Sequence, residues 1–267
     1  MKQAFTRPHL KCLGWKLFLA ILLSSNLQGQ VLTEKAQAER YDNQLYERIH
    51  KVLPSLMEQH GIDMWLLISR EYNEDPILRT FLPATWLNAR RRTIILFYKD
   101  EVSGSFEALA VARYGIGNAI KSAWDKEQQP DQWARLLELI QERDPKVIGL
   151  NYSEDYGIAD GIVKTDYEGL MAVLPTVYQQ RVVSAEPLAV SWIETRTPSE
   201  MAVFASMVDL THDIIAEAFS RQVITPGKTT SDDVVWWLRQ KVTDLGLQTW
   251  FHPTIDIQRS DEALKSH

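Results

Sequence analysis

Four short apolar runs constrain the fold of this chain more than any other feature. They cover residues 64–68, 93–98, 108–111 and 146–150 and are rich in Ile, Leu, Val and aromatic residues. Nearly continuous apolar runs of this length are typical of strands that are covered on both faces. Stretches with helical periodicity alternate with them, so the pattern predicts an α/β domain over about residues 35–190.

The predicted helices of this domain cover residues 34–60, 131–143 and 159–174. In the first, apolar residues recur at helical spacing, and Gly61 suits the position just after a helix end. In the second, Asp131 can cap the amino end and Pro145 follows the carboxyl end. We interpret His50 and His60 as residues of the first helix and not as ligands.

The chain changes character after residue 193. A capping box, Thr197-Pro198-Ser199-Glu200, predicts a long helix, and the turn at Pro226-Gly227 ends it before a second helix opens at Ser231. The predicted apolar side of the long helix contains Met201, Phe204, Val208, Thr211, Ile215 and Ala218. The adjacent Trp236 and Trp237 cannot share one helix face, so one of them should be core. A last extended piece is predicted over residues 251–257.

Residues 1–29 have the pattern of a secretory signal. Lys2, Arg7, Lys11 and Lys16 precede and border a short apolar run at residues 17–23, and small and polar residues follow. This predicts export to the periplasm or the exterior, with an uncleaved amphipathic anchor as the alternative. No later stretch predicts a membrane span.

Composition narrows the class further. The 267 residues are 45% hydrophobic and 24% charged, which is the balance of a globular chain with a sizeable core. The net charge of −6 gives no support for nucleic-acid binding. The single cysteine, Cys12, excludes an intramolecular disulfide framework and a cysteine-rich zinc module.

Motifs for chemistry are sparse. The sequence has six histidines without short metal-ligand spacing, and it has no H-E-x-x-H, G-x-S-x-G or glycine-rich phosphate loop. The run Arg90-Arg91-Arg92 is typical of a solvated edge or of salt-bridge donors, with an anion site as the alternative. Asp155 and Asp166 have the spacing of a carboxylate pair for a dinuclear metal site, but a surface loop is the favoured interpretation.

Residues 194–201, Glu-Thr-Arg-Thr-Pro-Ser-Glu-Met, resemble the linker and first helix of the catalytic domain in peptidase family M24, the creatinase/prolidase/aminopeptidase P group. Residues 224–233, which contain Pro226-Gly227, resemble the turn before that domain's second helix. Gly246 and residues 251–255 resemble the strand that follows. The order and spacing of these motifs carry the resemblance, which covers most of residues 35–260.

After the signal predicted at residues 1–29, the resemblance implies a creatinase-type α/β domain (30–193) and the start of an incomplete pita-bread (α+β) catalytic domain (194–267). In the family, two Asp, one His and two Glu hold two divalent metals, such as manganese, which activate water against a peptide bond before proline. No residue of this sequence occupies a family ligand position, so no catalytic residue, metal ligand or cofactor is expected in this chain. His252 and His267 are the candidate substrate-pocket residues.

The leading hypothesis is therefore the N-terminal portion of an exported Xaa-Pro aminopeptidase-like protein, inactive alone. Its partners would be proline-containing peptides in a complete enzyme and a second copy in a homodimer, with no nucleic acid. A non-catalytic binding or oligomerisation module and a creatinase-like C–N hydrolase are the alternatives. Whether the chain is itself an enzyme stays open, as do its substrate and metal.

Overall fold

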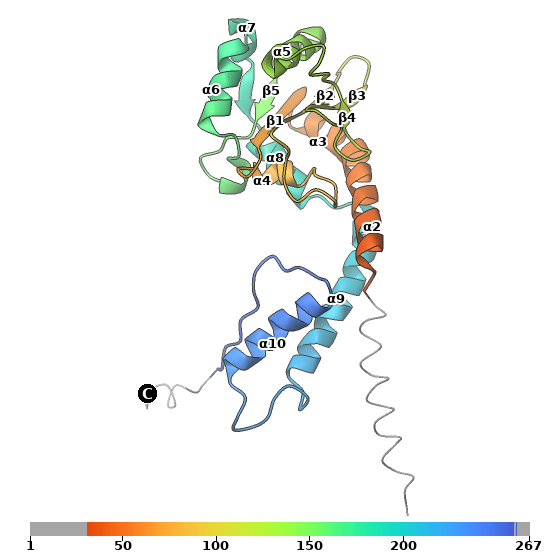
Figure 1. The fold of residues 1–267 in the computed structure, drawn as a ribbon, viewed down its shortest axis with the longest axis vertical. Helices are drawn as coiled ribbons and strands as arrows, with labels where there is room; N and C mark the ends of the chain where they lie inside the picture. The colour runs from red at the N-terminus through yellow and green to blue at the C-terminus, as the bar shows by residue number, and fades with distance from the viewer. Residues whose placement is uncertain (1–30, 259, 261–267) are drawn as a thin grey trace, which may run out of the picture. The chain divides into compact units, whose positions relative to one another are not determined.

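The computed structural model describes residues 31–258 and 260. The chain divides into two compact units: Ala36–Met201, here called the α/β unit, and Ala202–His267 with Met1–Lys35, here called the helical unit. Figure 1 shows the elements of both. The predicted signal at residues 1–29 lies outside the described residues, and the predicted family domains stay predictions.

A six-stranded mixed sheet forms the α/β unit, in the order β4-β3-β2-β1-β5-β6. The strands are β1 (Met64–Arg70), β2 (Arg92–Lys99), β3 (Phe106–Val111), β4 (Lys121–Ser122), β5 (Ile148–Leu150) and β6 (Val182–Ser184). β2 runs antiparallel to both β1 and β3, and the other pairs are parallel. The predicted α/β class and all four predicted strands are thus confirmed, whereas the sequence did not reveal the short β4 and β6.

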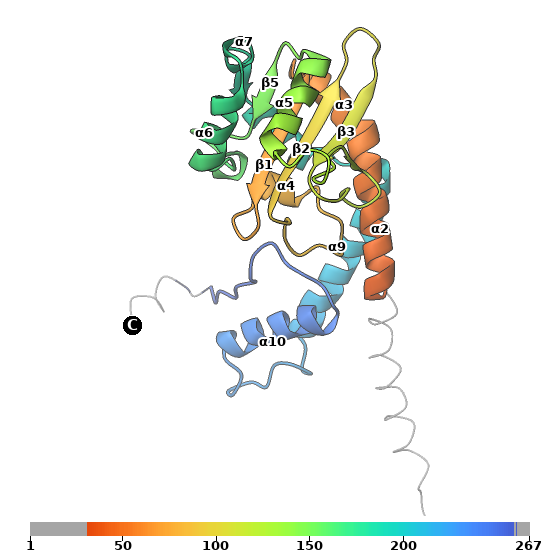
Figure 2. The same ribbon diagram turned by 45° about the horizontal axis from the view of Figure 1, so that its top comes forward.

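Helices cover both faces of this sheet, which explains the continuous apolar runs (Figures 1 and 2). On one face, Trp65 and Leu67 of β1 pack in a core with α3 (Leu53–Gln59), α4 (Pro76–Arg79) and α8 (Glu186–Glu194). On the other face, Leu66 and Ile68 pack with α5 (Gln132–Arg143), α6 (Lys164–Val173) and α7 (Thr176–Gln179). Alternate residues of one strand therefore serve two separate cores.

The first predicted helix is one helical run with a change of winding inside it. It consists of α2 (Glu34–Glu47), the π-helical η1 (Arg48–Val52) and α3. Pro54 lies just after the π segment; it has no N–H for a helical hydrogen bond, and its ring crowds the preceding turn. The π segment accommodates this irregularity. Gly61 follows the helix end with a φ of 60°, as expected.

The predicted helix over 159–174 is partly wrong. A 3-10 turn, η2 (Gly157–Ala159), comes first, and α6 begins only at Lys164. Between them, the amide groups of Gly161 and Ile162 both donate to the carbonyl of Asn151. A tertiary contact that the local sequence does not show thus replaces the first helical hydrogen bonds.

The helical unit contains most of α9 (Pro198–Ala218) and all of α10 (Ser231–Asp244), whose facing side chains form a small core. Thr197 and Glu200 form the predicted capping box of α9. As predicted, α10 begins at Ser231, and its N-cap is Thr230, which exchanges hydrogen bonds with Asp233. Trp237 packs against the core and Trp236 is exposed, as expected of adjacent positions.

Two other expectations for this unit are wrong, the first of them in part. The core side of α9 contains Leu210, Ile214 and Ala218; Ala218 was predicted there, whereas Val208 and Ile215 of the predicted stripe are exposed. Both sides of this helix are apolar, and the one that α10 covers defines the core. Residues 251–257 form no strand, because no strand pairs with them among the described residues.

Candidate anion-binding pocket

A pocket of about 840 Å³ lies in the α/β unit, at the end of the sheet where β1 and β3 finish and β2 begins. Three loops supply its walls: residues 85–91 before β2, residues 112–114 after β3, and residues 124–126 before α5. Antiparallel pairing places these loops together, since Ile94 of β2 lies opposite Val111 of β3. Glu71, just after β1, completes the lining.

The backbone beside this pocket is held in an uncommon conformation. Arg91 has a φ of 56° and Tyr72 a φ of 71°, which are left-handed values that residues other than glycine rarely adopt. Two hydrogen bonds fix the strand ends: Glu71 N donates to Arg91 O at 2.6 Å, and Arg91 N donates to the Glu71 carboxylate at 3.1 Å. Backbone conformations of this kind persist where surrounding contacts impose them, and they concentrate at functional sites.

Arg92 belongs to the wall of the pocket and is already engaged. Its Nε donates to Gln132 at 2.9 Å, its guanidinium lies 4.3 Å from the centre of the Trp133 ring, and its Nη1 is 3.9 Å from Asp166. Burial lowers the pKa of this guanidinium, and the charge of Asp166 opposes that effect. The contacts therefore fix Arg92 as a rigid part of the wall.

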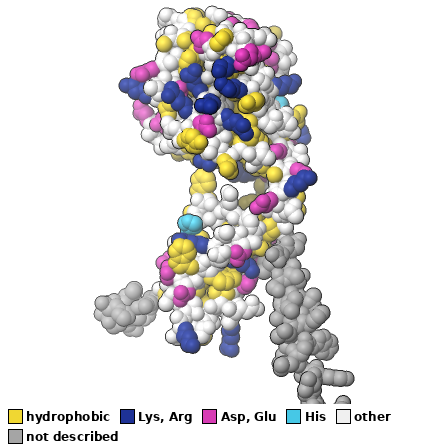
Figure 3. All heavy atoms as spheres, viewed as in Figure 1, with side chains coloured by type: hydrophobic (Ala, Val, Ile, Leu, Met, Phe, Trp, Pro, Cys, Tyr) yellow, Lys and Arg dark blue, Asp and Glu magenta, His cyan; other side chains and the backbone are white. Residues whose placement is uncertain are grey.

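The other cations of the pocket are not neutralised by acids. Arg90, Arg91, Arg113 and Lys126 are exposed, and none forms an ion pair with a carboxylate of the described residues. Figure 3 shows Lys and Arg side chains gathered on the visible face of the α/β unit. Four unpaired cations thus surround one hollow in a chain whose net charge is −6. Such a concentration of one sign attracts anions.

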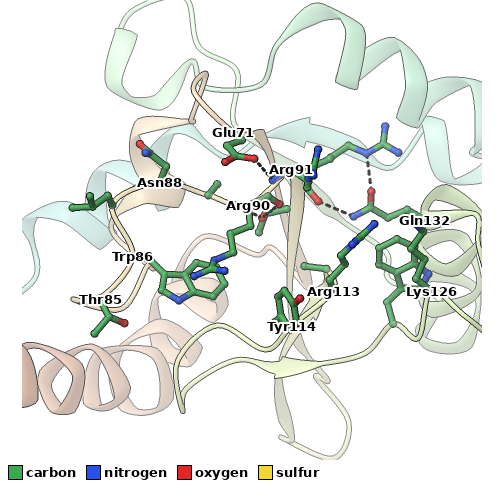
Figure 4. A pocket seen from close by; sticks show the side chains of 16 residues that line it. Glu71, Thr85, Trp86, Asn88, Arg90, Arg91, Arg113, Tyr114, Lys126 and Gln132 are labelled. Carbon is green, nitrogen blue, oxygen red and sulfur yellow. Dashed lines mark hydrogen bonds between the residues drawn. The ribbon is translucent and has the colours of Figure 1, made fainter.

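Aromatic rings line the same hollow. The Arg90 guanidinium lies over the Trp86 ring, 4.8 Å from its centre, and the Tyr114 side chain is 57% exposed. Trp124 is fixed by a hydrogen bond from its Nε1 to Gln129 O at 2.7 Å. Figure 4 shows Tyr114 between the Trp86–Arg90 pair on one side and Arg113 on the other.

The structure places the sequence-predicted residues elsewhere. His252 is exposed in a segment without regular structure, and His267 lies outside the described residues. Their proposed substrate-pocket roles stay predictions. Asp155 is exposed in a loop, as favoured, but the surface interpretation is wrong for Asp166, which is fully buried in α6 and accepts hydrogen bonds from Arg70.

Sequence reasoning identified only the arginine run, and it favoured a solvated edge for that run. It missed Trp86, Arg113, Tyr114 and Lys126, which no motif connects. The available signal was Arg113-Tyr114 directly after an apolar strand, a position where side chains of adjacent loops can meet.

A metal centre is not formed by the part of the chain that is described. Within it, no group of three or more His, Cys, Asp or Glu side chains is arranged to hold a metal ion. The same residues contain no helix with the length and hydropathy needed to cross a bilayer.

Comparison with known proteins gives distant likenesses to solved structures alone. No family model matches the sequence, and no curated protein matches it. Among solved structures, the chain is similar to an Xaa-Pro dipeptidase from Bacillus anthracis, with 13% identity and a TM-score of 0.43. The alignment covers 78% of this chain and 50% of that one, so this chain spans about half of its length. A likeness this distant concerns the path of the chain and assigns no activity.

Proposed function

We propose that the α/β unit is a binding domain that holds an anionic ligand in the pocket described above. The observation that carries this proposal is the set of four unpaired cations, Arg90, Arg91, Arg113 and Lys126, around one hollow. Elsewhere in this unit, Arg70 and Arg143 have carboxylate partners. A group of cations without such partners is stabilised when an anion enters.

The chemistry of the pocket favours oxyanions. Guanidinium groups present planar pairs of donors that match phosphate and carboxylate oxygens. Glu71 is the single acid in the lining, and its carboxylate accepts a hydrogen bond from the Arg91 amide. The positive charge in the hollow therefore exceeds the negative charge by a wide margin.

Calorimetric titration of the whole protein with pyrophosphate tests this function. We expect binding that weakens as salt rises from about 50 to 500 mM, because salt screens charges at an exposed site. The double variant Arg91→Gln/Arg113→Gln should bind at least about tenfold more weakly. A control, Arg40→Gln/Lys164→Gln, removes the same charge from positions outside the pocket and should bind like the wild type. Absence of binding, or equal loss in both double variants, would refute the proposal.

A relation to M24 peptidases is the second candidate function. It is favoured by the order of the sequence landmarks and by the capping box that Thr197 and Glu200 form at the start of α9. In this hypothesis the α/β unit is the N-terminal domain of an Xaa-Pro peptidase-like protein. The described residues do not fit a two-metal centre, so the hypothesis assigns them no step of peptide hydrolysis.

The assay for the second candidate uses the purified chain with manganese and an Xaa-Pro peptide. We expect no metal-dependent release of the first amino acid, since a two-metal mechanism needs several ligands around the bridging water. Turnover that requires manganese and disappears with a chelator would show that this chain holds a catalytic centre. The result is independent of the pyrophosphate titration.

A further inference from the structure

The charge and the shape of the pocket together restrict its ligand. Four unpaired cations face one acid, so a ligand with several closely spaced negative charges matches the hollow better than a single carboxylate. The volume of about 840 Å³ is that of a site for a small molecule. A compact polyphosphate group satisfies both conditions.

A bare polyphosphate would leave the aromatic wall unused. The Tyr114 side chain is 57% exposed, and the flat Arg90 guanidinium lies over the Trp86 ring. Aromatic rings and guanidinium planes are the surfaces on which planar heterocycles stack. Figure 4 shows the Trp86–Arg90 pair on one side of Tyr114, and Arg113 and Lys126 on its other side.

One polar side chain of the lining is available to a ligand. Asn88 lines the pocket, is half-buried, and its amide has no hydrogen-bond partner among the described residues. An amide offers both donors and an acceptor, as the edge of a heterocycle requires.

We propose that the pocket takes a nucleoside diphosphate or triphosphate. Arg91, Arg113 and Lys126 contact the phosphates, and the base stacks between Tyr114 and the Trp86–Arg90 pair. This inference rests on the proposed anion-binding function and adds the ligand class. An acidic peptide is the competing ligand. It spreads its charge along an extended chain, so fewer of its charges would face the clustered cations at once.

Equilibrium titrations of the whole protein with ATP, tripolyphosphate and a tetraglutamate peptide, all with EDTA present, test the ligand class. We expect ATP to bind at least about tenfold more tightly than tripolyphosphate, because stacking of one base on an aromatic residue contributes this much. Equal affinity for the two would overturn the nucleotide proposal and leave the anion site standing. No binding of either would overturn both, and tightest binding of tetraglutamate would replace the nucleotide with a peptide.

A variant of Tyr114 tests whether the nucleotide base stacks on this side chain. Tyr114→Leu should abolish the preference for ATP and leave tripolyphosphate affinity within about twofold of the wild type. Tyr156→Leu is the matched control, because Tyr156 is 53% exposed and lies outside the pocket. The thermal unfolding midpoint of each variant confirms folding. An unchanged preference in Tyr114→Leu, or an equal loss in both variants, would overturn the assignment of the base to this wall.

Discussion

Arg92 and Gln132 bind each other in both directions: Arg92 Nε donates to Gln132 Oε1 at 2.9 Å, and Gln132 Nε2 donates to Arg92 O at 3.0 Å. The same amide also donates to Val111 O at 2.6 Å. One buried side chain at the start of α5 therefore connects the first residue of β2 with the last residue of β3, at the wall of the pocket.

Gln132→Met should lower the free energy of unfolding by about 1–3 kcal/mol, because it removes the donor of the buried Val111 carbonyl and of the part-buried Arg92 carbonyl. Urea denaturation measures this loss. Gln129→Met is the control, since the Gln129 side chain makes only an exposed hydrogen bond to Glu138, and it should change stability by less than about 0.5 kcal/mol. Equal effects would contradict a connecting role for Gln132.

Removing Arg70 should destabilise the fold more than removing the charge of Asp166, its ion-pair partner. Arg70 donates through two nitrogens to Asp166, whose side chain is 0% exposed, whereas the side chain of Arg70 is 46% exposed. Arg70→Met leaves the buried carboxylate with the more distant Arg92 as its remaining ion-pair partner. This substitution should lower the free energy of unfolding by about 2–4 kcal/mol.

Asp166→Asn should cost less, about 1–2 kcal/mol, because the Arg70 guanidinium then turns toward solvent. Urea denaturation of both variants at neutral pH gives the comparison. A larger loss in Asp166→Asn would show that burial of the carboxylate is not the controlling factor.

Asp75 makes stability depend on pH in an unusual direction. Its buried carboxylate accepts hydrogen bonds from the Ile77 amide and the Asn151 side chain, and desolvation by burial raises its pKa above the ordinary aspartate value. The folded state then holds the proton more tightly than the unfolded state does. Asp75 therefore contributes most at low pH and loses that contribution as pH rises through its folded pKa.

The measurable consequence is the stability of the wild type minus that of Asp75→Asn, which should fall as pH rises from about 4 to 7. Asp100→Asn is a control of opposite sign. Hydrogen bonds from Ser103 and Val102 lower the pKa of Asp100, so its contribution grows as pH rises through the acid range. If the free energies of unfolding of the wild type and of Asp75→Asn changed in parallel with pH, the raised pKa of Asp75 would be contradicted.

Two adjacent isoleucines of α9 predict different costs of truncation. Ile214 is 7% exposed in the core of the helical unit, and Ile215 is 45% exposed. Ile214→Ala should cost about 2–4 kcal/mol, because it leaves a cavity, whereas Ile215→Ala should cost less than about 1 kcal/mol. Thermal or urea unfolding of both variants, with a signal that reports on the helical unit, measures the two losses. The reverse order would support the helix face that the sequence pattern favours.

The strands and helix ends were predictable because their signals are local. The four strands of the sheet with long apolar runs lie where those runs lie, since both faces of the sheet are covered. Asp131 caps α5 and Thr197 caps α9 through hydrogen bonds within a few residues of the chain. The short β6 was missed because three residues at the sheet edge give too little pattern.

The local sequence pattern predicted burial wrongly where contact with another element decides which side chains are buried. The α9 helix is apolar on two sides, and contact with Val234 and Leu238 of α10 determines that Ile214 and not Ile215 is core. The carboxylate of Asp166 could equally have been a surface group. Its burial follows from the position of Arg70 at the end of β1.

The amino-acid sequence by itself determined the α/β class, the positions of the four strands that lie in apolar runs, and the chain's overall negative charge. Only the tertiary structure brought Arg91, Arg113 and Lys126 around one hollow. The antiparallel pairing of β2 with β3 places the first two, and the loop before α5 adds the third. The physical reason is that secondary structure depends on side chains a few positions apart. A binding site depends on which charges become neighbours in space, and no periodicity of the sequence records that.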